Sequence, residues 1–386
     1  MKKKLLYVTG SRAEYGIMKR LLLALSNDSQ IQLTIVATGM HCDSKYGMTY
    51  KVIEEDGLVI DKLIEIDINN NNNSDILKSM SICQNKFGQY FEKNKFDAVM
   101  LLGDRYEIFS VAIAAAIHNI PIIHLHGGEK TLGNYDEFIR HSITKMSRLH
   151  LASTEEYRNR IIQMGEFPNT VHNIGALGAE NALLMNLPTK YQLEEKYGSL
   201  NSPYFIVVFH PETLSSIPLV TQTENLLNAL ERLKGVYEFI FIGSNSDTGS
   251  DKITQKIKDF CNKNESRLLV SVKPEEYLAL NKYSQGLIGN SSSGLIEIPS
   301  LKIPTINIGN RQKGRVRGNT VIDCQCNTEE IFNAILFSQS SDFSNKVSNS
   351  INPYYKNNVL EAALQIIKSY MNSIESGYKD FYDVNI

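Results

Sequence analysis

Short apolar runs alternate with segments of helical composition along the whole chain. In the first half, the pattern predicts strands at residues 4–9, 32–38, 98–102, 120–125, 149–153 and 170–174, with helices at 15–25, 108–117 and 154–164. These apolar runs do not alternate with polar residues, which is typical of strands covered on both faces of a parallel sheet. Strands separated by helices indicate an α/β fold with parallel strands.

The same alternation begins again in the second half. It predicts strands at residues 204–209, 239–242, 268–272, 286–288 and 305–308, a helix at 295–298 and a long closing helix at 354–373. Polar clusters follow most of these strands. We therefore predict two similar α/β domains, 1–175 and 176–355, with an active site in the cleft between them and a C-terminal segment at 356–386. Ligands in open α/β sheets bind outside the carboxyl ends of the strands.

Composition narrows the function classes. The 386 residues are 42% hydrophobic and 21% charged, as in ordinary globular proteins. Lys and Arg number 40 against 42 Asp and Glu, so no nucleic-acid or membrane partner is indicated. Five scattered cysteines make no disulfide framework, which favours a reducing cytoplasm. Cys324 and Cys326 lack a second pair at metal spacing, so we expect no metal site.

Charged residues concentrate after two predicted central strands. Asp104 and Arg105 follow the strand at 98–102, whereas His126 and Glu129 follow the strand at 120–125. Two glycines follow His126, so we select His126 and not His124 for the cleft. Two further carboxylates stand at the start of the next helix, Asp136 and Glu137. A hydrophobic core needs no such set, so we expect it to carry a reaction. By contrast, the asparagine run at 69–73 is interpreted as a surface loop without a function.

The second half carries the features of a phosphate site. Residues 290–294, Asn-Ser-Ser-Ser-Gly, open a predicted helix, where backbone N–H groups and hydroxyls favour an anion. Arg311, Arg315 and Arg317 can add charge-assisted hydrogen bonds. Glu297 lies one turn inside the helix, where its carboxylate could accept hydrogen bonds from ribose hydroxyls. The three-glycine dinucleotide fingerprint is absent, so we expect a nucleoside diphosphate and no NAD or other cofactor.

Eight sequence blocks, taken together, resemble one family over essentially the whole chain. They are GSRAEYG (10–16), LGDRYE (102–107), HGGEKT (126–131), DEFIRHSITK (136–145), FHPET (209–213), GSNSDTGS (243–250), GNSSSGLIE (289–297) and GNRQKGR (309–315). The chain resembles the hydrolysing UDP-N-acetylglucosamine 2-epimerases of bacterial sialic acid and capsule biosynthesis. The resemblance implies two Rossmann-like domains facing across a cleft, as in GT-B glycosyltransferases. It also implies a C-terminal helix that packs back on the first domain, and a homo-oligomer, either a dimer or a tetramer.

The resemblance assigns roles to individual positions. Asp104, Glu129 and Asp136, together with His126, match the catalytic side of the family. Many relatives carry a glutamate where this chain has His126, which leaves the identity of the general base open. The remaining matched or neighbouring positions form the expected UDP-sugar site: Arg12, Ala13, Glu14, Arg105, Glu137, His210, Asn245, Ser291, Ser292, Glu297, Arg311 and Arg315.

The implied reaction converts UDP-N-acetylglucosamine and water to N-acetylmannosamine and UDP through a glycal intermediate. It needs stabilisation of the leaving diphosphate, a base for the C2 proton, and an acid and a base for adding water. Two alternatives stay open. One is the same reaction on UDP-2,4-diacetamido-2,4,6-trideoxyglucose in the legionaminic acid pathway. The other is a sugar-nucleotide glycosyltransferase or sensor on the same scaffold.

Overall fold

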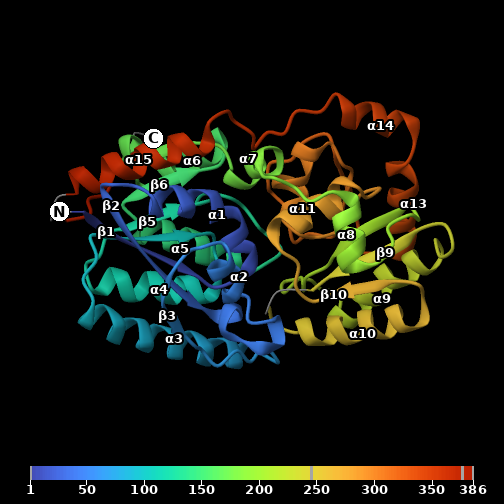
Figure 1. Cartoon of the computed structure of the whole chain (residues 1–386), viewed down its shortest axis with the longest axis horizontal. Helices are drawn as coiled ribbons and strands as arrows, with labels where there is room; N and C mark the ends of the chain where they lie inside the picture. Colours follow the sequence, from blue (N-terminus) through green and yellow to red (C-terminus); the bar gives the residue numbers. More distant parts are fainter. Residues whose placement is uncertain (1, 244–246, 375–377, 385–386) are drawn as a thin grey trace.

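Two parallel α/β units lie side by side in the computed structural model of the chain (Figure 1). The structure describes residues 2–243, 247–374 and 378–384. Each unit has one sheet with helices on both faces, which confirms the predicted fold class of two Rossmann-like domains.

The first sheet has seven strands in the order β3-β2-β1-β4-β5-β6-β7, and every neighbouring pair is parallel. The strand order reverses between β1 and β4, where ligands bind in doubly wound folds. The strands are β1 (Lys3–Thr9), β2 (Ile31–Thr38), β3 (Ile60–Ile64), β4 (Ala98–Leu102), β5 (Ile122–Leu125), β6 (Leu149–Ala152) and β7 (Val171–Asn173).

The second sheet repeats this order over six parallel strands, β10-β9-β8-β11-β12-β13, and reverses between β8 and β11. Its strands are β8 (Tyr204–Val208), β9 (Glu238–Ile242), β10 (Arg267–Leu269), β11 (Leu287–Gly289), β12 (Thr305–Ile308) and β13 (Val321–Cys324). The two switch points face each other, so the fold itself sets up a cleft between the units.

Helices cover both faces of each sheet. Those of the first unit are α1 (Arg12–Ser26), α2 (Tyr50–Glu55), α3 (Asn73–Lys93), α4 (Tyr106–Ile117), α5 (Asp136–Met146) and α6 (Glu155–Gln163). Those that follow are α7 (Leu177–Leu184), α8 (Lys190–Tyr197), α9 (Leu219–Glu231), α10 (Ser250–Lys263), α11 (Pro274–Lys282), α12 (Ser293–Ile296), α13 (Thr328–Ser338), α14 (Ser341–Ser348) and α15 (Val359–Ser373). Short 3₁₀ turns are η1 (Gly39–Cys42), η2 (Ser44–Tyr46), η3 (Pro168–Thr170) and η4 (Ile298–Leu301).

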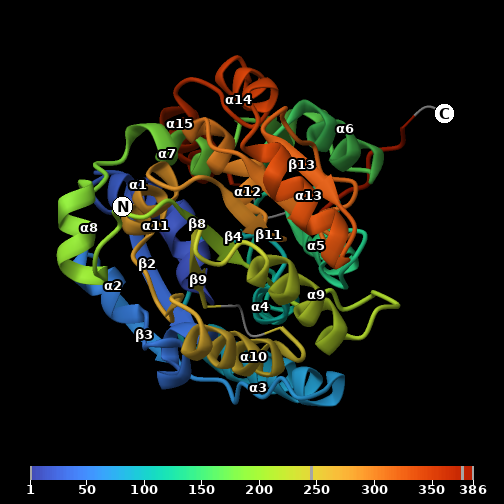
Figure 2. The same ribbon diagram turned by 90° about the vertical axis from the view of Figure 1, so that its right-hand side faces the viewer.

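The last helix belongs to the first unit by packing. Val359, Ala363, Ile367 and Met371 of α15 are buried in the same apolar cluster as residues of β1 and α1. Figure 1 shows α15 lying over the first unit after the chain has returned from the second. In the second unit, α9 and α13 lie on one side of the sheet and α8 and α11 on the other (Figure 2).

Several helix boundaries differ from the predicted ones. Helix α1 begins at Arg12 and not at residue 15, since the Ser11 hydroxyl and the Glu14 carboxylate form a capping box. Helix α4 begins at Tyr106, two residues earlier than predicted. The closing helix begins at Val359 and not at residue 354. The helix predicted at 295–298 is the four-residue α12, which is followed by η4.

The asparagine run at 69–73 is also different from the prediction. Most of it is exposed, and Asn72 caps α3, but Asn70 is only 2% exposed. The Asn70 amide donates to the Ser250 hydroxyl over 2.7 Å, and its carbonyl accepts from the N–H of Gly249 over 2.9 Å. The prediction of a surface loop is therefore wrong for Asn70 in one respect: the residue lies in a loop, but it is buried and joins the two units.

Within the described ranges, none of the helices has both the length and the apolar character that crossing a membrane requires.

Candidate active site

A cavity of about 220 Å³ lies between the two switch points. The first unit contributes the residues that follow β1, β4 and β5, and the second unit those that follow β8, β11 and β12. Its polar wall includes Ser11, Arg12, Glu14, Asp104, Arg105, His126, Glu129, Thr131, Asp136, Arg140, His210, Asp247, Tyr277, Ser291, Ser292, Ser293, Glu297, Arg311, Gln312 and Arg315. The cavity thus combines anion-binding and proton-transferring side chains.

The start of α1 places an arginine at the cavity wall. One Glu14 carboxylate oxygen accepts hydrogen bonds from the N–H groups of Gly10 (2.6 Å) and Ser11 (3.1 Å), which fixes the turn after β1. Burial and the nearby Glu107 charge raise the pKa of Glu14 to about 8. Arg12 follows directly, and among the described residues it has no ion-pair partner. A half-buried arginine without a carboxylate partner is suited to an anionic ligand.

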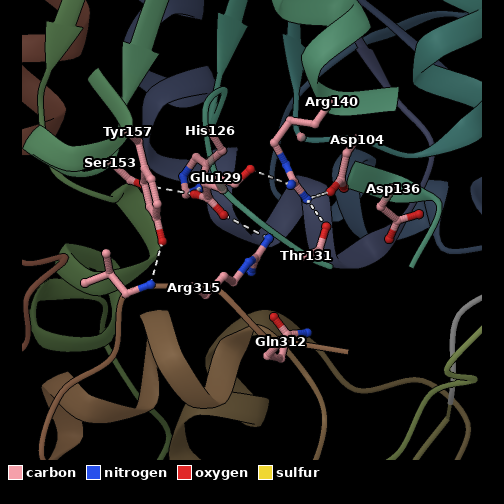
Figure 3. A network of polar contacts seen from close by, with 12 residues as sticks. Asp104, His126, Glu129, Thr131, Asp136, Arg140, Ser153, Tyr157, Gln312 and Arg315 are labelled. Carbon is pink, nitrogen blue, oxygen red and sulfur yellow. Dashed lines mark hydrogen bonds and ion pairs between the residues drawn. The ribbon is translucent and has the colours of Figure 1, made fainter. Parts of the chain in front are cut away.

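A second arginine, Arg140 of α5, organises the first-unit wall (Figure 3). Its side chain is 1% exposed, forms an ion pair with Asp104, and donates to the Glu129 backbone carbonyl (2.9 Å) and the Thr131 hydroxyl (3.1 Å). Arg140 therefore holds Asp104 in the loop after β4 and the chain after β5 in fixed relative positions.

Glu129 is the centre of a buried network (Figure 3). Its carboxylate accepts from the His126 Nδ1 over 2.8 Å and from the Ser153 hydroxyl over 2.9 Å, and it pairs with Arg315 over 2.8 Å. Burial alone would raise the pKa of Glu129, but the charge of Arg315 and the two hydrogen bonds outweigh it and lower the pKa to about 2. Glu129 is therefore a permanent carboxylate at neutral pH, which orients the imidazole of His126.

His126 has an unusual backbone conformation. Its φ of +63° lies in the left-handed region, which side chains other than glycine rarely adopt. A hydrogen bond from its N–H to the Leu151 carbonyl (3.0 Å) holds this turn. Strained residues of this kind concentrate at functional sites. The turn aims the imidazole into the cavity, while His124 faces away and contacts the Gly103 carbonyl (2.8 Å) and Thr144 (3.2 Å).

The pKa of Asp136 is raised, whereas that of Glu129 is lowered. Asp136 accepts from the Asn134 amide (3.0 Å) and lies 3.7 Å from Arg311 of the second unit. Burial and the negative charge of Asp247 raise the pKa of Asp136 to about 7, against the lowering effect of Arg311. A carboxyl group that titrates near neutrality can accept and release a proton at working pH.

The second-unit wall is built around Asn290, directly after β11. The Asn290 side chain accepts from the His210 N–H (2.8 Å) and donates to the His210 carbonyl (2.9 Å), so the ends of β8 and β11 are tied together. The Asn290 carbonyl accepts from Gln312 (2.8 Å) and Arg311 (3.3 Å). Ser292 makes no side-chain capping bond to α12, so its hydroxyl faces the cavity free of a helix-capping role.

Two further carboxylates complete the wall. Burial raises the pKa of Glu297, at the end of α12, to about 7. Asp247 lies 3.6 Å from Arg311 and 3.8 Å from Arg105, and so pairs with arginines of both units. Arg105 also pairs with Glu107 over 2.5 Å.

The structure brings most of the predicted site residues to one cavity. Of the sixteen predicted residues, fourteen line the cavity: Ala13 and thirteen of the polar wall residues named above. Glu137 does not: its carboxylate accepts from the N–H of Thr131 and lies 3.3 Å from His141, so it supports the loop behind the wall. Asn245 lies outside the described residues.

Sequence reasoning missed several polar residues of the wall. Arg140, Thr131, Asp247, Tyr277 and Gln312 line the cavity but were not singled out. Arg140 stands four residues after Asp136 on a predicted helix, a spacing that places both on one face and could have identified it. The other four gave no such signal, because their partners come from distant parts of the chain.

Several buried polar atoms of the wall have no hydrogen-bond partner among the described residues: Glu14 Oε1, Asp247 Oδ2, Arg311 Nε, Gln312 Oε1, Arg315 Nε and Arg315 Nη1. Buried polar atoms are otherwise almost always hydrogen-bonded, so their concentration here indicates a polar ligand. In the described part of the chain, no three His, Cys, Asp or Glu side chains are arranged to hold a metal ion.

Comparison with known proteins identifies the family of the chain. The family model described as UDP-N-acetylglucosamine 2-epimerase matches residues 23–368. The chain belongs to the UDP-N-acetylglucosamine 2-epimerase family. Among curated relatives, this epimerase-family chain is 60% identical to the polysialic acid biosynthesis protein P7 of Escherichia coli, over 99% of this chain and 98% of that protein.

Two further similarities extend the comparison. The chain is 40% identical to a Campylobacter jejuni protein named GDP/UDP-N,N'-diacetylbacillosamine 2-epimerase (hydrolyzing), over 84% of this chain and 85% of that one. Its fold is shared by the UDP-GlcNAc 2-epimerase of Neisseria meningitidis solved with bound UDP-GlcNAc, with a TM-score of 0.79 and 19% identity, covering 95% of this chain and 100% of that one.

Proposed function

We propose that the protein is a hydrolysing 2-epimerase that converts UDP-N-acetylglucosamine and water to N-acetylmannosamine and UDP. One observation carries the proposal. A single cavity combines buried arginines and hydroxyls on one wall with a histidine held by an ionised glutamate and a carboxyl group of near-neutral pKa on the other. The first set suits a departing diphosphate and the second suits proton transfer at the sugar.

The leaving group needs positive charge where it develops negative charge. Arg12 lacks a carboxylate partner among the described residues, and Arg311 has an Nε without a hydrogen bond. Together with the hydroxyls of Ser291 and Ser292, these groups can donate to the phosphate oxygens as the anomeric C–O bond breaks. We expect His210 to contribute from the end of β8, and Glu297 to accept from the ribose hydroxyls.

The sugar half of the reaction needs two proton transfers. In the first, a base removes the proton from C2, the C1–C2 double bond forms, and the bond between C1 and the UDP oxygen breaks. We assign this base to Asp136, whose pKa of about 7 matches neutral pH. In the second, a proton reaches C2 from the other face while water adds its oxygen to C1. The proton that this water loses passes to solvent, as does the proton that Asp136 has taken up.

We assign the second transfer to His126. Glu129 accepts from the Nδ1 of His126, which fixes the ring and its tautomer. Glu129 itself, with a pKa of about 2, stays ionised and exchanges no proton. Asp104, which is tied to Arg140, orients that arginine and the loop after β5. The four predicted catalytic residues thus divide into two that transfer protons and two that position them.

The similarity to the Escherichia coli polysialic acid biosynthesis protein supports a place in making N-acetylmannosamine for sialic acid. We expect the enzyme to work in the cytoplasm as a homo-oligomer, a dimer or a tetramer, which light scattering of the purified protein measures.

A second substrate is favoured by one specific observation. The Campylobacter jejuni relative, 40% identical, is named for the 2-epimerisation of N,N'-diacetylbacillosamine nucleotides. The same residues would perform the same elimination and hydration on UDP-2,4-diacetamido-2,4,6-trideoxyglucose. The two substrates differ at C4 and C6, so the choice between them depends on the sugar end of the cavity.

The test is to incubate the purified protein with each UDP-sugar, without an acceptor or NAD, and to identify the products by NMR. Free UDP with N-acetylmannosamine supports the proposal. A faster reaction with the diacetamido sugar favours the second substrate. A UDP-linked manno sugar indicates a non-hydrolysing epimerase, and no product without an acceptor favours a glycosyltransferase; both results overturn the proposal.

A further inference from the structure

A closed ring of three hydrogen bonds lies beside the active site, between Tyr157, Tyr354 and the backbone of Val316. The N–H of Val316 donates to the Tyr157 hydroxyl over 2.8 Å, and the Tyr354 hydroxyl donates to the Val316 carbonyl over 2.8 Å. The two tyrosine hydroxyls are 2.8 Å apart. Because the Tyr354 proton is directed to the carbonyl, Tyr157 must be the donor to Tyr354, and every group in the ring is satisfied.

The ring joins three separate parts of the chain. Tyr157 stands on α6 of the first unit, Val316 lies in the loop after β12 of the second, and Tyr354 lies in the segment that returns to α15. Both tyrosines are 0% exposed. The Tyr354 backbone is itself fixed, since its carbonyl accepts from the Ala176 N–H over 2.8 Å. The ring is therefore a rigid, dry contact at the boundary of the two units.

Its position next to Arg315 gives it a functional meaning. Arg315 directly precedes Val316 and crosses the cleft to pair with Glu129 over 2.8 Å. Figure 3 shows the Tyr157 hydroxyl directed at the backbone of the loop that carries Arg315. The Nε and Nη1 of Arg315 have no hydrogen-bond partner among the described residues, so the Glu129 pair and the backbone hold this side chain in place.

We propose that Tyr157 and Tyr354 are positioning residues, which hold the Val316 backbone so that Arg315 stays paired with Glu129 and Glu129 in turn orients His126. The proposal rests on the proposed function, because it assigns the two tyrosines to the same proton-transfer network. Neither tyrosine touches the reacting sugar, and neither lines the cavity.

The ring makes a specific prediction for phenylalanine substitutions. Tyr354→Phe removes the donor to the Val316 carbonyl, and Tyr157→Phe removes the acceptor of the Val316 N–H, while both rings keep their packing. We expect kcat to fall about tenfold in each variant, while KM changes less than about twofold. A tenfold fall in kcat corresponds to the free energy of one lost hydrogen bond.

A matched control separates positioning from stability. Tyr204 is 1% exposed, and its hydroxyl donates to the Leu280 carbonyl over 2.8 Å in the core of the second unit, away from the cavity. Tyr204→Phe removes an equally buried tyrosine hydrogen bond. We expect a similar change in thermal midpoint but a kcat like that of the wild type.

A double-mutant comparison tests the route through Arg315. Tyr354→Phe is measured in the wild type and in an Arg315→Lys background. The proposal expects a smaller effect in the second, because the guanidinium group that the ring positions is already gone. Equal effects in both backgrounds, or effects no larger than those of Tyr204→Phe, overturn the proposal. So does a loss of folding in both ring variants while Tyr204→Phe folds, since the ring is then only structural. A wild type that makes no N-acetylmannosamine refutes the proposed function instead.

Discussion

The contribution of the ionised Glu129 to the free energy of unfolding can be worked out directly from its pKa. Its pKa is about 2 against an ordinary value of 4.5, so the folded protein favours the ionised form by about 3 kcal/mol. The Glu129→Gln substitution keeps the shape of the side chain but replaces the ionised form with a neutral one. It leaves the buried Arg315 without its carboxylate. We therefore expect it to destabilise the protein by about 3 kcal/mol at neutral pH, which lowers the thermal midpoint of a unit of this size by roughly 6–12 °C.

The pH dependence follows with a definite sign. A carboxyl group whose pKa is lowered by folding stabilises the protein fully above its unfolded pKa, and this stabilisation is lost as the pH falls toward the folded pKa. The difference between the wild type and Glu129→Gln should therefore be largest at neutral pH and shrink from about pH 4.5 towards pH 2. Scanning calorimetry of both proteins over a pH series measures this difference.

A matched control and a refuting result complete the test. Glu155 forms an ion pair with Arg158 over 3.0 Å, but its side chain is 57% exposed. Exposed ion pairs contribute only about 0–1 kcal/mol, so Glu155→Gln should change the midpoint little. If Glu129→Gln is as stable as Glu155→Gln at neutral pH, Glu129 is not held as a strongly stabilised carboxylate, and its assigned role is refuted.

Three other predictions concern catalysis, binding and the contact between the units. The kcat/KM of the wild type should fall below about pH 7 because Asp136 becomes protonated. This fall should be absent in the weakly active Asp136→Asn variant. It should remain in Glu297→Gln, although burial raises the pKa of Glu297 to about 7 as well. Arg12→Met should weaken UDP binding about 10–100-fold, as measured by titration calorimetry. The thermal midpoint should not fall, since no carboxylate among the described residues loses its partner. A lower midpoint with unchanged UDP affinity would contradict this prediction. Asn70→Ala should raise KM about fivefold, while the exposed Asn71→Ala changes nothing; equal KM values for the two variants would contradict the contact at Ser250.

Much of the fold could be predicted because it depends on local patterns. Buried parallel strands leave continuous apolar runs, so β4, β5 and β8 were visible in the sequence. Helix starts were less predictable, because α1 begins where the side chains of Ser11 and Glu14 replace the missing backbone partners. The apolar runs of β3 and β13 are short and carry polar residues, and neither strand was predicted.

The candidate site was predictable to the extent that fold geometry determines it. The carboxyl ends of parallel strands meet at one edge, which is why Asp104 and His126 line the same cavity. Contacts across the cleft could not be predicted, because they depend on how two domains pack. The pairing of Glu129 with Arg315 is of this kind, and it changes Glu129 from a candidate proton carrier into a fixed charge. Asn70 is a similar case: its sequence is typical of a loop, but the second unit buries it.

The most direct test of the proposed function is the reaction of the purified protein with UDP-N-acetylglucosamine in D₂O, followed by proton NMR. In the proposed mechanism the C2 proton is removed and a solvent deuteron takes its place. We therefore expect the released sugar to be N-acetylmannosamine with deuterium at C2, formed together with free UDP. N-acetylglucosamine that keeps its C2 proton would instead show simple hydrolysis, and a sugar still linked to UDP would show epimerisation without water. Either result would contradict the elimination and hydration that we assign to Asp136 and His126.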